Sequence, residues 1–206
     1  VDTAQPDTVR ALSQVTIKGE VRDNNGNLVT NFNGIIYPTV YDKAAKITTL
    51  GQGTPVFTFL LQKNILFKGK ASVTNGIFSF SFIVPKDIAY NFDKGKVSYY
   101  AHSGFQDASG NFEDFVIGGT DTNAVADALG PDIKLYMNDD EFVFGGITNT
   151  EPKIYAIVSD VNGINTAGTS IGHDVTAVLD GNNAQPIVLN DYYESDLDNY
   201  KSGTVR

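Results

Sequence analysis

The chain has 206 residues, a mass of 22.2 kDa, and 15 basic against 24 acidic side chains, which gives a formal net charge of −9. Because it has no cysteine, disulfides, zinc–thiolate sites, iron–sulfur clusters and thiol nucleophiles are excluded. The acidic balance argues against a nucleic-acid partner, and no run of about 18 apolar residues is present that could form a transmembrane segment.

Apolar residues recur with a period of two, which is typical of β-strands. The runs that show this pattern are Val15–Val21, Phe78–Val84, Val97–Ala101, Lys153–Val158 and Val175–Leu179. Six phenylalanines mostly follow the same spacing, so we expect them to lie on core faces of strands: Phe57, Phe59, Phe67, Phe78, Phe80 and Phe82. The pattern predicts an all-β fold.

Turn-forming pairs separate these runs. Asn25-Gly26, Asn75-Gly76 and Asp180-Gly181 tolerate the positive φ angles that tight hairpin turns need. Ser109-Gly110-Asn111 is similar, and we expect a turn there too. Short strands separated by such turns every 8–12 residues favour β-sandwiches.

Composition and charge divide the chain near residue 120. Residues 1–130 carry 11 basic and 12 acidic side chains (net −1), and residues 131–206 carry 4 and 12 (net −8). We predict tandem immunoglobulin-like β-sandwiches at 13–120 and 131–206, joined by a linker at 121–130 and preceded by a lead-in at 1–12 from another domain. The second has only 76 residues, so we expect it to be incomplete, with its C-terminus truncated.

Two histidines are candidates for acid–base or metal chemistry. His102 follows a strand-like run with no second histidine nearby, so a structural role at a strand end is favoured. His173-Asp174 follows a Gly/Asn/Thr/Ser loop and could form a dyad with a Ser or Thr nucleophile. The structural alternative is that the pair holds the loop by hydrogen bonds to the backbone.

Acidic clusters are candidates for calcium, which prefers six to eight oxygen ligands. The densest are Asp139-Asp140-Glu141 and the set Asp191, Glu194, Asp196 and Asp198. Asp23–Asn27 resembles the start of a calcium loop, but a hairpin explains it. None has the spacing of a dedicated calcium loop, so a solvated acidic face is favoured and no metal or cofactor is expected. Tyr192-Tyr193 could form a sugar- or peptide-binding patch, although the absence of tryptophan weakens the sugar interpretation.

An ordered set of segments resembles one family over about residues 10–195. The segments are Ala11–Gly19, Ile36–Lys43, Lys68–Gly76, Phe80–Ile88, Gly130–Asp139, Gly172–Asp174 and Val188–Tyr193. Together they resemble the region downstream of the catalytic domain in PorU-type sortases, the gingipain-like cysteine endopeptidases of the type IX secretion system in Bacteroidetes.

The resemblance implies a cell-surface, outer-membrane-associated parent protein that removes C-terminal sorting domains from secreted cargo and joins the cargo to anionic lipopolysaccharide. Its catalytic Cys and His would lie upstream, so no catalytic residue is carried over and this chain is expected to be non-catalytic. The expected role is that of a spacer or docking module. The implied partners are the upstream peptidase domain, outer-membrane secretion components and cargo sorting domains.

Two alternatives from other classes stay open at this point. One is a surface adhesin or glycan-binding module that is unrelated to the sortase. The other is a small hydrolase that uses Ser or Thr with His173-Asp174. A sandwich fold cannot decide between them, because the fold hosts many functions.

Overall fold

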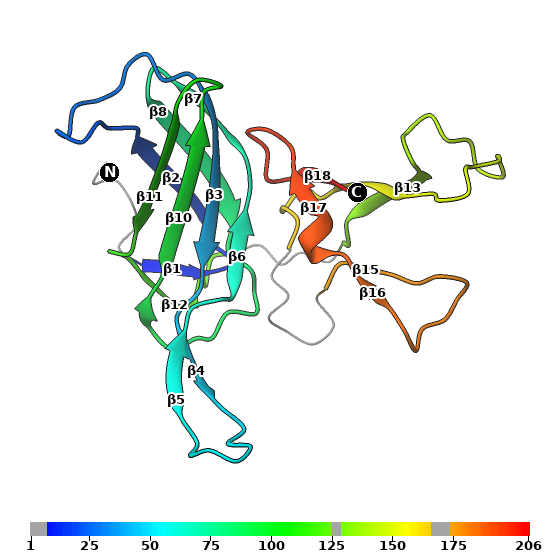
Figure 1. The fold of residues 1–206 in the computed structure, drawn as a ribbon, viewed down its shortest axis with the longest axis horizontal. Coiled ribbons are helices and arrows are strands. Elements are labelled where there is room, and N and C mark those ends of the chain that lie inside the picture. The colour runs from blue at the N-terminus through cyan, green and yellow to red at the C-terminus, as the bar shows by residue number, and fades with distance from the viewer. Residues whose placement is uncertain (1–7, 125–128, 166–173) are drawn as a thin grey trace.

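The computed structural model describes residues 8–124, 129–165 and 174–206. These residues form an all-β protein with one single-turn 3₁₀ helix, η1 (Asn190–Tyr192) (Figure 1). That turn is the one helix in the described ranges, and it is far shorter than a membrane crossing requires. The strands gather in two assemblies, which we call the N-terminal sandwich (residues 8–124) and the C-terminal sheet assembly (residues 129–206).

The main sheet of the N-terminal sandwich has seven strands, and β3 lies near its centre. Their order is β11 (Asp107–Phe112), β10 (Lys96–His102), β3 (Gly34–Tyr41), β7 (Ala71–Thr74), β8 (Ile77–Ile83) and β2 (Gln14–Glu20), with β6 (Ile65–Lys68) also paired to β3. In the β2–β8 ladder Val15 lies opposite Phe82 and Ile17 opposite Phe80. All four side chains are buried, so the alternation in these two runs is confirmed.

A smaller sheet packs on the same core. In it β12 (Val116–Thr120) pairs in parallel with β1 (Thr8–Ala11) and antiparallel with β9 (Asp93–Lys94). Val9 and Ala11 of β1 are buried in the main core. Residues 8–11 lie in the segment that we expected to be a lead-in, yet they form a strand of the sandwich itself. The wider division of the chain into domains stays a prediction.

The turns agree with the Asx-Gly pairs. Asn75 and Gly76 have φ angles of 53° and 78° and join β7 to β8, and Asp180 and Gly181 have 51° and 73° between β15 and β16. Asn75-Gly76 forms a two-residue hairpin, for which such paired positive φ angles are typical, whereas Asp180-Gly181 makes a turn within the longer connection between Ala177 and Ile187. The expected turn at residues 109–111 is wrong: these residues lie within β11, opposite Ser98–Tyr100. The chain turns earlier, where the Ser103 N–H donates to the Gln106 carbonyl.

The C-terminal sheet assembly has one four-stranded antiparallel sheet and one short pair. The sheet order is β13 (Asp132–Met137), β14 (Ile154–Ser159), β18 (Ser202–Val205) and β17 (Tyr193–Ser195). The short pair joins β15 (Thr176–Ala177) and β16 (Ile187–Val188). This matches the A-B-E-D sheet of an immunoglobulin domain, with β15 in the place of strand C.

The core of this second assembly is small. It contains Ala156, Val158, Tyr193 and Val205, with Ile164, Val175 and Leu189 packed beside them. On β13, Ile133 and Leu135 lie opposite Val158 and Ala156, yet half or more of each side chain is exposed. In the described ranges, the strands facing this sheet are β15 and β16 alone, so the second sandwich is incomplete.

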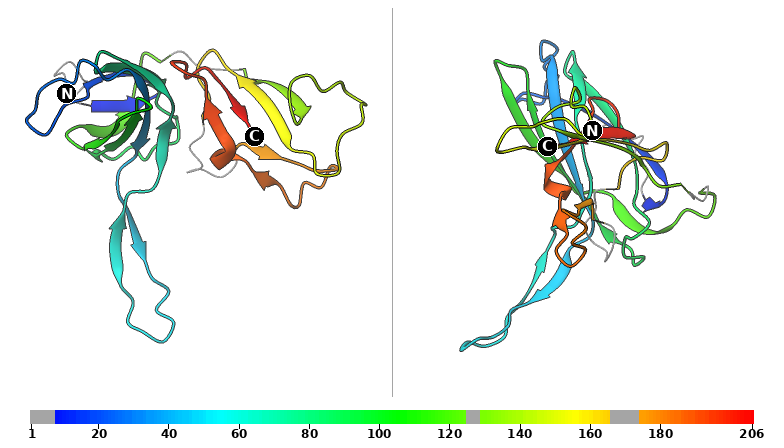
Figure 2. Two further views of the ribbon diagram at one scale, coloured as in Figure 1. Left: turned by 45° about the horizontal axis from the view of Figure 1, so that its top comes forward. Right: turned by 90° about the vertical axis from the view of Figure 1, so that its right-hand side faces the viewer.

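A long hairpin leaves the N-terminal sandwich. It consists of β4 (Ala45–Thr48) and β5 (Thr58–Leu61) and projects away from both sheets (Figures 1 and 2). Phe57 and Phe59 lie on it and are 65 % and 38 % exposed, so the expectation that they lie in the core is wrong. The reason is that β4 and β5 pair only with each other, and no described sheet lies against them. Phe78, Phe80 and Phe82 are buried as expected.

Candidate functional site

His102 lies at the end of β10 and contacts a tyrosine rather than an acid–base partner. Its Nε2 atom is 3.3 Å from the Tyr37 hydroxyl, and the two rings stack with centroids 5.7 Å apart. Tyr100 lies directly opposite Tyr37 on the same outer face. The geometry is that of a surface aromatic cluster on a rigid sheet, which favours the structural interpretation of His102.

The second candidate, His173-Asp174, is described only in part. His173 lies outside the described residues. The Asp174 carboxylate accepts a hydrogen bond from Asn190 Nδ2 at 3.1 Å, and Asn190 Oδ1 accepts the Val175 N–H at 2.8 Å. Asp174 therefore ties the approach to β15 to helix η1 through a side-chain contact, and the loop-holding interpretation, which called for bonds to the backbone, stays a prediction.

Two of the acidic segments cap turns. Asp139 accepts the Glu141 N–H at 3.1 Å, and Asp23 accepts the N–H groups of Asn25 and Asn27 at 2.9 and 2.8 Å. These donors, with the Asn27 backbone first, lower the pKa of Asp23. Across the described part of the chain, no three His, Asp or Glu side chains gather in a geometry that could hold a metal ion.

The third acidic set does not converge on one point. Asp196 contacts the Ser202 hydroxyl within its own hairpin. Glu194 and Asp198 instead face the N-terminal sandwich, where they bind residues far away in the sequence. Tyr192 is exposed while Tyr193 is buried, and both line one cavity of about 390 Å³. Burial raises the pKa of the Tyr193 hydroxyl.

The contact of this acidic loop with the N-terminal sandwich is the candidate functional site, which we call the junction. The Asp198 carboxylate accepts the Ser72 N–H on Oδ1 and the Ser72 hydroxyl on Oδ2, both at 2.7 Å. The Asp198 N–H donates to the Lys70 carbonyl at 3.0 Å, and Lys70 forms a parallel β-bridge with Leu197. Lys70 Nζ lies 2.7 Å from Glu194 Oε1.

A break in the main sheet makes Lys70 available. Strands β6 and β7 both pair with the same edge of β3, and residues 69 and 70 lie between them. Pro38 lies on β3 where the partner changes, at a position with no N–H to donate. A Cβ on Gly69 would lie 2.3 Å from the Phe67 ring, so glycine lets that ring pack over the backbone there.

Tyr200 adds an apolar contact to the junction. It lies in the β17–β18 hairpin, yet it packs against the core of the N-terminal sandwich. Its neighbours include Phe67, which stacks on Phe82 at 4.9 Å. Cavities of about 200 and 570 Å³ flank Tyr200, one lined by Phe80 and Asp198 and the other by Phe82 and Ile164. A third cavity, of about 390 Å³, lies on the other side of Lys70.

Lys70, Ser72 and Tyr200 were not singled out from the sequence. Lys70 and Ser72 lie in a strand-like stretch whose pattern carries no sign of a partner more than 120 residues away. The acidic cluster at 191–198 was the one available signal, and it was interpreted as a solvated face. At the junction the carboxylates hold two assemblies together.

Comparison with known proteins finds similarity among solved structures. No protein-family model matches the chain, and no curated protein matches it. Among solved structures it is similar to the crystal structure of dimeric latent PorU from Porphyromonas gingivalis, with 30 % identity and a TM-score of 0.59. The match covers 96 % of this chain and 19 % of the PorU chain, so this chain is PorU-like over nearly its whole length and spans about a fifth of that structure.

Proposed function

We propose that the chain is a non-catalytic accessory segment of a cell-surface PorU-type sortase of the type IX secretion system. The similarity to PorU over 96 % of the chain is the observation that carries this proposal. With no cysteine, the segment cannot supply the thiol nucleophile of a gingipain-like peptidase. The peptidase activity of the parent would belong to a different part of the protein, upstream of this region.

Within that parent we assign the segment the role of a spacer that holds the N-terminal sandwich and the C-terminal sheet assembly at a fixed angle to each other. The junction supports this role because it combines a β-bridge, a carboxylate with two donors, an ion pair and a partly buried tyrosine. An inter-domain contact without such links would let the two assemblies reorient. The partners we propose are the peptidase domain of the parent, outer-membrane secretion components and the sorting domains of cargo.

The proposal is tested in the full-length parent by loosening the junction. The double variant Asp198→Ala, Ser72→Ala should leave cleavage of a short soluble peptide unchanged. On cells, however, it should lower the release of sorting domains from cargo, because the active site would no longer be held at the right place. Asp23→Ala is the matched control, since Asp23 also accepts backbone N–H groups but lies away from the junction.

Two results would contradict the proposal. Thiol-independent proteolysis by the pure 206-residue chain would show that the segment is itself an enzyme. An open reading frame with no Cys–His peptidase domain upstream of this segment would remove the sortase parent.

One observation favours a second candidate, a glycan-binding module. The 390 Å³ cavity beside Lys70 is lined by Tyr37 and Tyr192, with the cations Lys68 and Arg206. Aromatic rings beside polar groups are a common way to bind sugars and other amphipathic ligands. Binding of the chain to a glycan array, abolished by Tyr37→Ala and retained in Phe105→Ala, would support this candidate.

A further inference from the structure

Strand β11 (Asp107–Phe112) forms one edge of the main sheet, and we call its outer side the open edge. Six consecutive residue pairs join β11 to β10 without a bulge, and in the described ranges no strand pairs with its other side. Every second residue of such a strand directs its N–H and C=O groups away from its neighbour. Figure 1 shows β11 on the side of the sandwich away from the C-terminal sheet assembly. The open edge therefore offers unpaired backbone groups to solvent.

The open edge has none of the features that usually keep a sheet edge from pairing. Such features are lysine, proline, dense charge or a bulge. The opposite edge of the same sheet, β2, carries Lys18 and Glu20, whereas residues 108–112 of β11 are Ala, Ser, Gly, Asn and Phe. Ala108 and Phe112 pack against the core, so the backbone of β11 is held in place. The strand is thus a regular template for another strand.

An aromatic cluster lies on the outer face of the sheet beside the open edge. Tyr100 lies opposite Ser109 of β11 on one side and opposite Tyr37 of β3 on the other. The ring centroids of Tyr37 and Tyr100 are 6.2 Å apart, and the His102 ring lies 5.7 and 6.3 Å from them. Tyr100 is 47 % exposed. The cation–π contacts within the described ranges lie elsewhere, so no Lys or Arg of those ranges covers this cluster.

The charge at the open edge is negative. Residues 103–115 contain three acidic side chains and no Lys or Arg. Asp107 lies opposite His102, and it forms no ion pair with the described residues. Desolvation, followed by the charge of Asp107 and a hydrogen bond to it, raises the pKa of the Tyr100 hydroxyl, so the carboxylate lies beside this side chain. An unpaired carboxylate next to aromatic rings is a site that attracts a cation.

We propose that the open edge binds an extended segment of a partner polypeptide, which adds to β11 as a further strand and places a Lys or Arg side chain over Asp107 and Tyr100. Backbone hydrogen bonds supply the affinity in this mode of recognition, and the alternate side chains supply the specificity. Only the short side chain of Ser109 separates the added strand from the Tyr100 ring, so a long basic side chain can reach it. The inference goes beyond the proposed function, because the spacer role does not use this edge.

Other ligand classes fit the open edge less well. Nucleic acid is repelled by the acidic side chains, and a second copy of β11 brings no Lys or Arg to meet Asp107. A bilayer interior leaves the unpaired backbone groups unsatisfied. A glycan could stack on Tyr37 and Tyr100 but would leave the backbone of β11 unused. An extended basic segment is the one class that satisfies the edge, the rings and the carboxylate together.

Peptide binding to the 206-residue chain tests the inference. The probe is a short fluorescent peptide in which threonine and arginine alternate. Two comparison peptides carry glutamate in place of arginine, or methyl groups on alternate backbone nitrogens of the arginine peptide. We expect both changes to weaken binding at least about tenfold. In NMR spectra the arginine peptide should slow amide exchange at residues 107–112 and not in β2, the opposite edge of the same sheet.

Matched variants locate the site. Asp107→Asn and Tyr100→Leu should each weaken binding of the arginine peptide by about threefold to fivefold, as expected for an exposed ion pair and an exposed cation–π contact. Asp132→Asn and Tyr90→Leu are the controls and should leave binding unchanged. Asp132 is an exposed aspartate on the edge strand of the other assembly, and Tyr90, which is 55 % exposed, adjoins β12.

Each other outcome overturns the inference. Equal affinity for the arginine and glutamate peptides would show that the edge has no cation site. Equal affinity for the methylated peptide would show attraction by charge without an added strand. The same weakening in Asp132→Asn would trace binding to the net charge of the chain, and no binding up to about 1 mM would show that the edge accepts no strand. None of these results bears on the sortase proposal, which is tested by cargo release on cells.

Discussion

Asp198 and Ser72 are 126 positions apart in the sequence, yet the Asp198 carboxylate accepts both the N–H and the hydroxyl of Ser72 at 2.7 Å. Asp198 also adopts a φ angle of 57°, in the left-handed region that Asp tolerates better than most residues. One residue therefore both shapes the tip of the β17–β18 hairpin and binds it to the N-terminal sandwich.

A double-mutant cycle between these two residues measures the side-chain part of this contact. We expect a coupling energy of about 1 kcal/mol between Ser72→Ala and Asp198→Ala in urea unfolding, since charge-assisted hydrogen bonds contribute about this much or more when partly exposed. Any backbone strain that Asp198→Ala introduces is the same with Ser72 and with Ser72→Ala, so it cancels from the coupling energy. A coupling energy of zero would show that the hydroxyl contact does not link the two assemblies.

Tyr200 should contribute more than Asp198. Replacing Tyr200 with Ala removes a ring that fills the space between two cavities beside Phe67, and we expect a loss of about 2 kcal/mol in unfolding free energy. Tyr200→Phe keeps the ring and serves as the control, with an expected change under about 0.5 kcal/mol. Small-angle scattering should show reorientation of the two assemblies in Tyr200→Ala only. Equal scattering profiles for both variants would contradict this role.

Local pattern predicted much of the N-terminal sandwich. The alternation in Val15–Val21 and Phe78–Val84 specified two strands and their buried faces, and Asn75-Gly76 specified the turn before β8. The same rule failed for Phe57 and Phe59, because a period of two says which side chains share a face and not whether anything covers that face. The turn-residue rule failed at Ser109–Asn111, where polar and glycine residues lie in an exposed edge strand.

The junction could be predicted only in part. An acidic cluster at residues 191–198 was visible, but its partners Lys70 and Ser72 are fixed by the sheet break between β6 and β7. Such a contact depends on the whole topology, and a single sequence contains no local signal for it. The structural interpretation of His102 rests on one contact, with Tyr37 on the neighbouring strand. The pairing of β3 with β10 brings these two side chains together.

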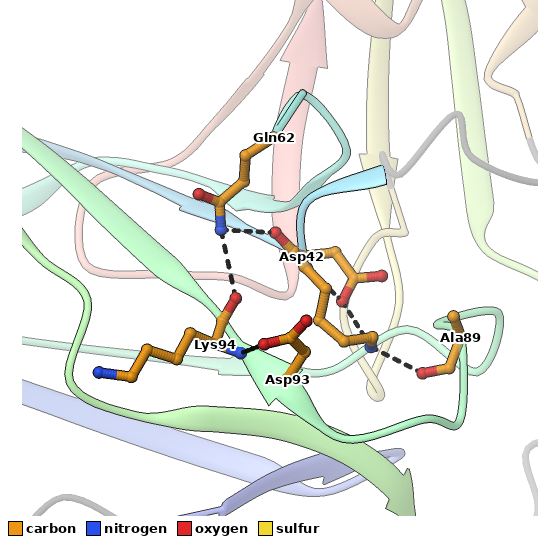
Figure 3. A network of polar contacts seen from close by, with 6 residues as sticks. Asp42, Gln62, Ala89, Asp93 and Lys94 are labelled. Carbon is orange, nitrogen blue, oxygen red and sulfur yellow. Dashed lines mark hydrogen bonds and ion pairs between the residues drawn. The ribbon is translucent and has the colours of Figure 1, made fainter. Parts of the chain in front are cut away.

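The buried ion pair at the root of the β4–β5 hairpin should be sensitive to loss of one partner (Figure 3). Lys43→Met leaves the Asp42 carboxylate buried without its cation and the Ala89 carbonyl without its donor, so we expect a loss of about 3 kcal/mol. The double variant Asp42→Asn, Lys43→Met removes the stranded charge and should recover part of this loss. Urea unfolding of the three proteins measures the difference. If both variants lose the same stability, the loss in Lys43→Met does not come from the stranded Asp42 charge.

Alkaline pH should weaken the N-terminal sandwich through Tyr99. Burial against Phe78 and Phe80 raises the pKa of the Tyr99 hydroxyl to about 12, from an ordinary value of 10. The unfolded chain therefore ionises first, so the stability that neutral Tyr99 provides is complete below pH 10 and is lost as pH rises from 10 to 12. The expected loss is on the order of 2 kcal/mol. Tyr99→Phe keeps the ring contacts and should remove this part of the pH dependence, whereas Tyr192→Phe, at an exposed position, should not. Thermal unfolding of the three proteins between pH 9 and 12 measures this effect. If stability falls identically with pH in the wild type and in Tyr99→Phe, Tyr99 is not the cause of the loss.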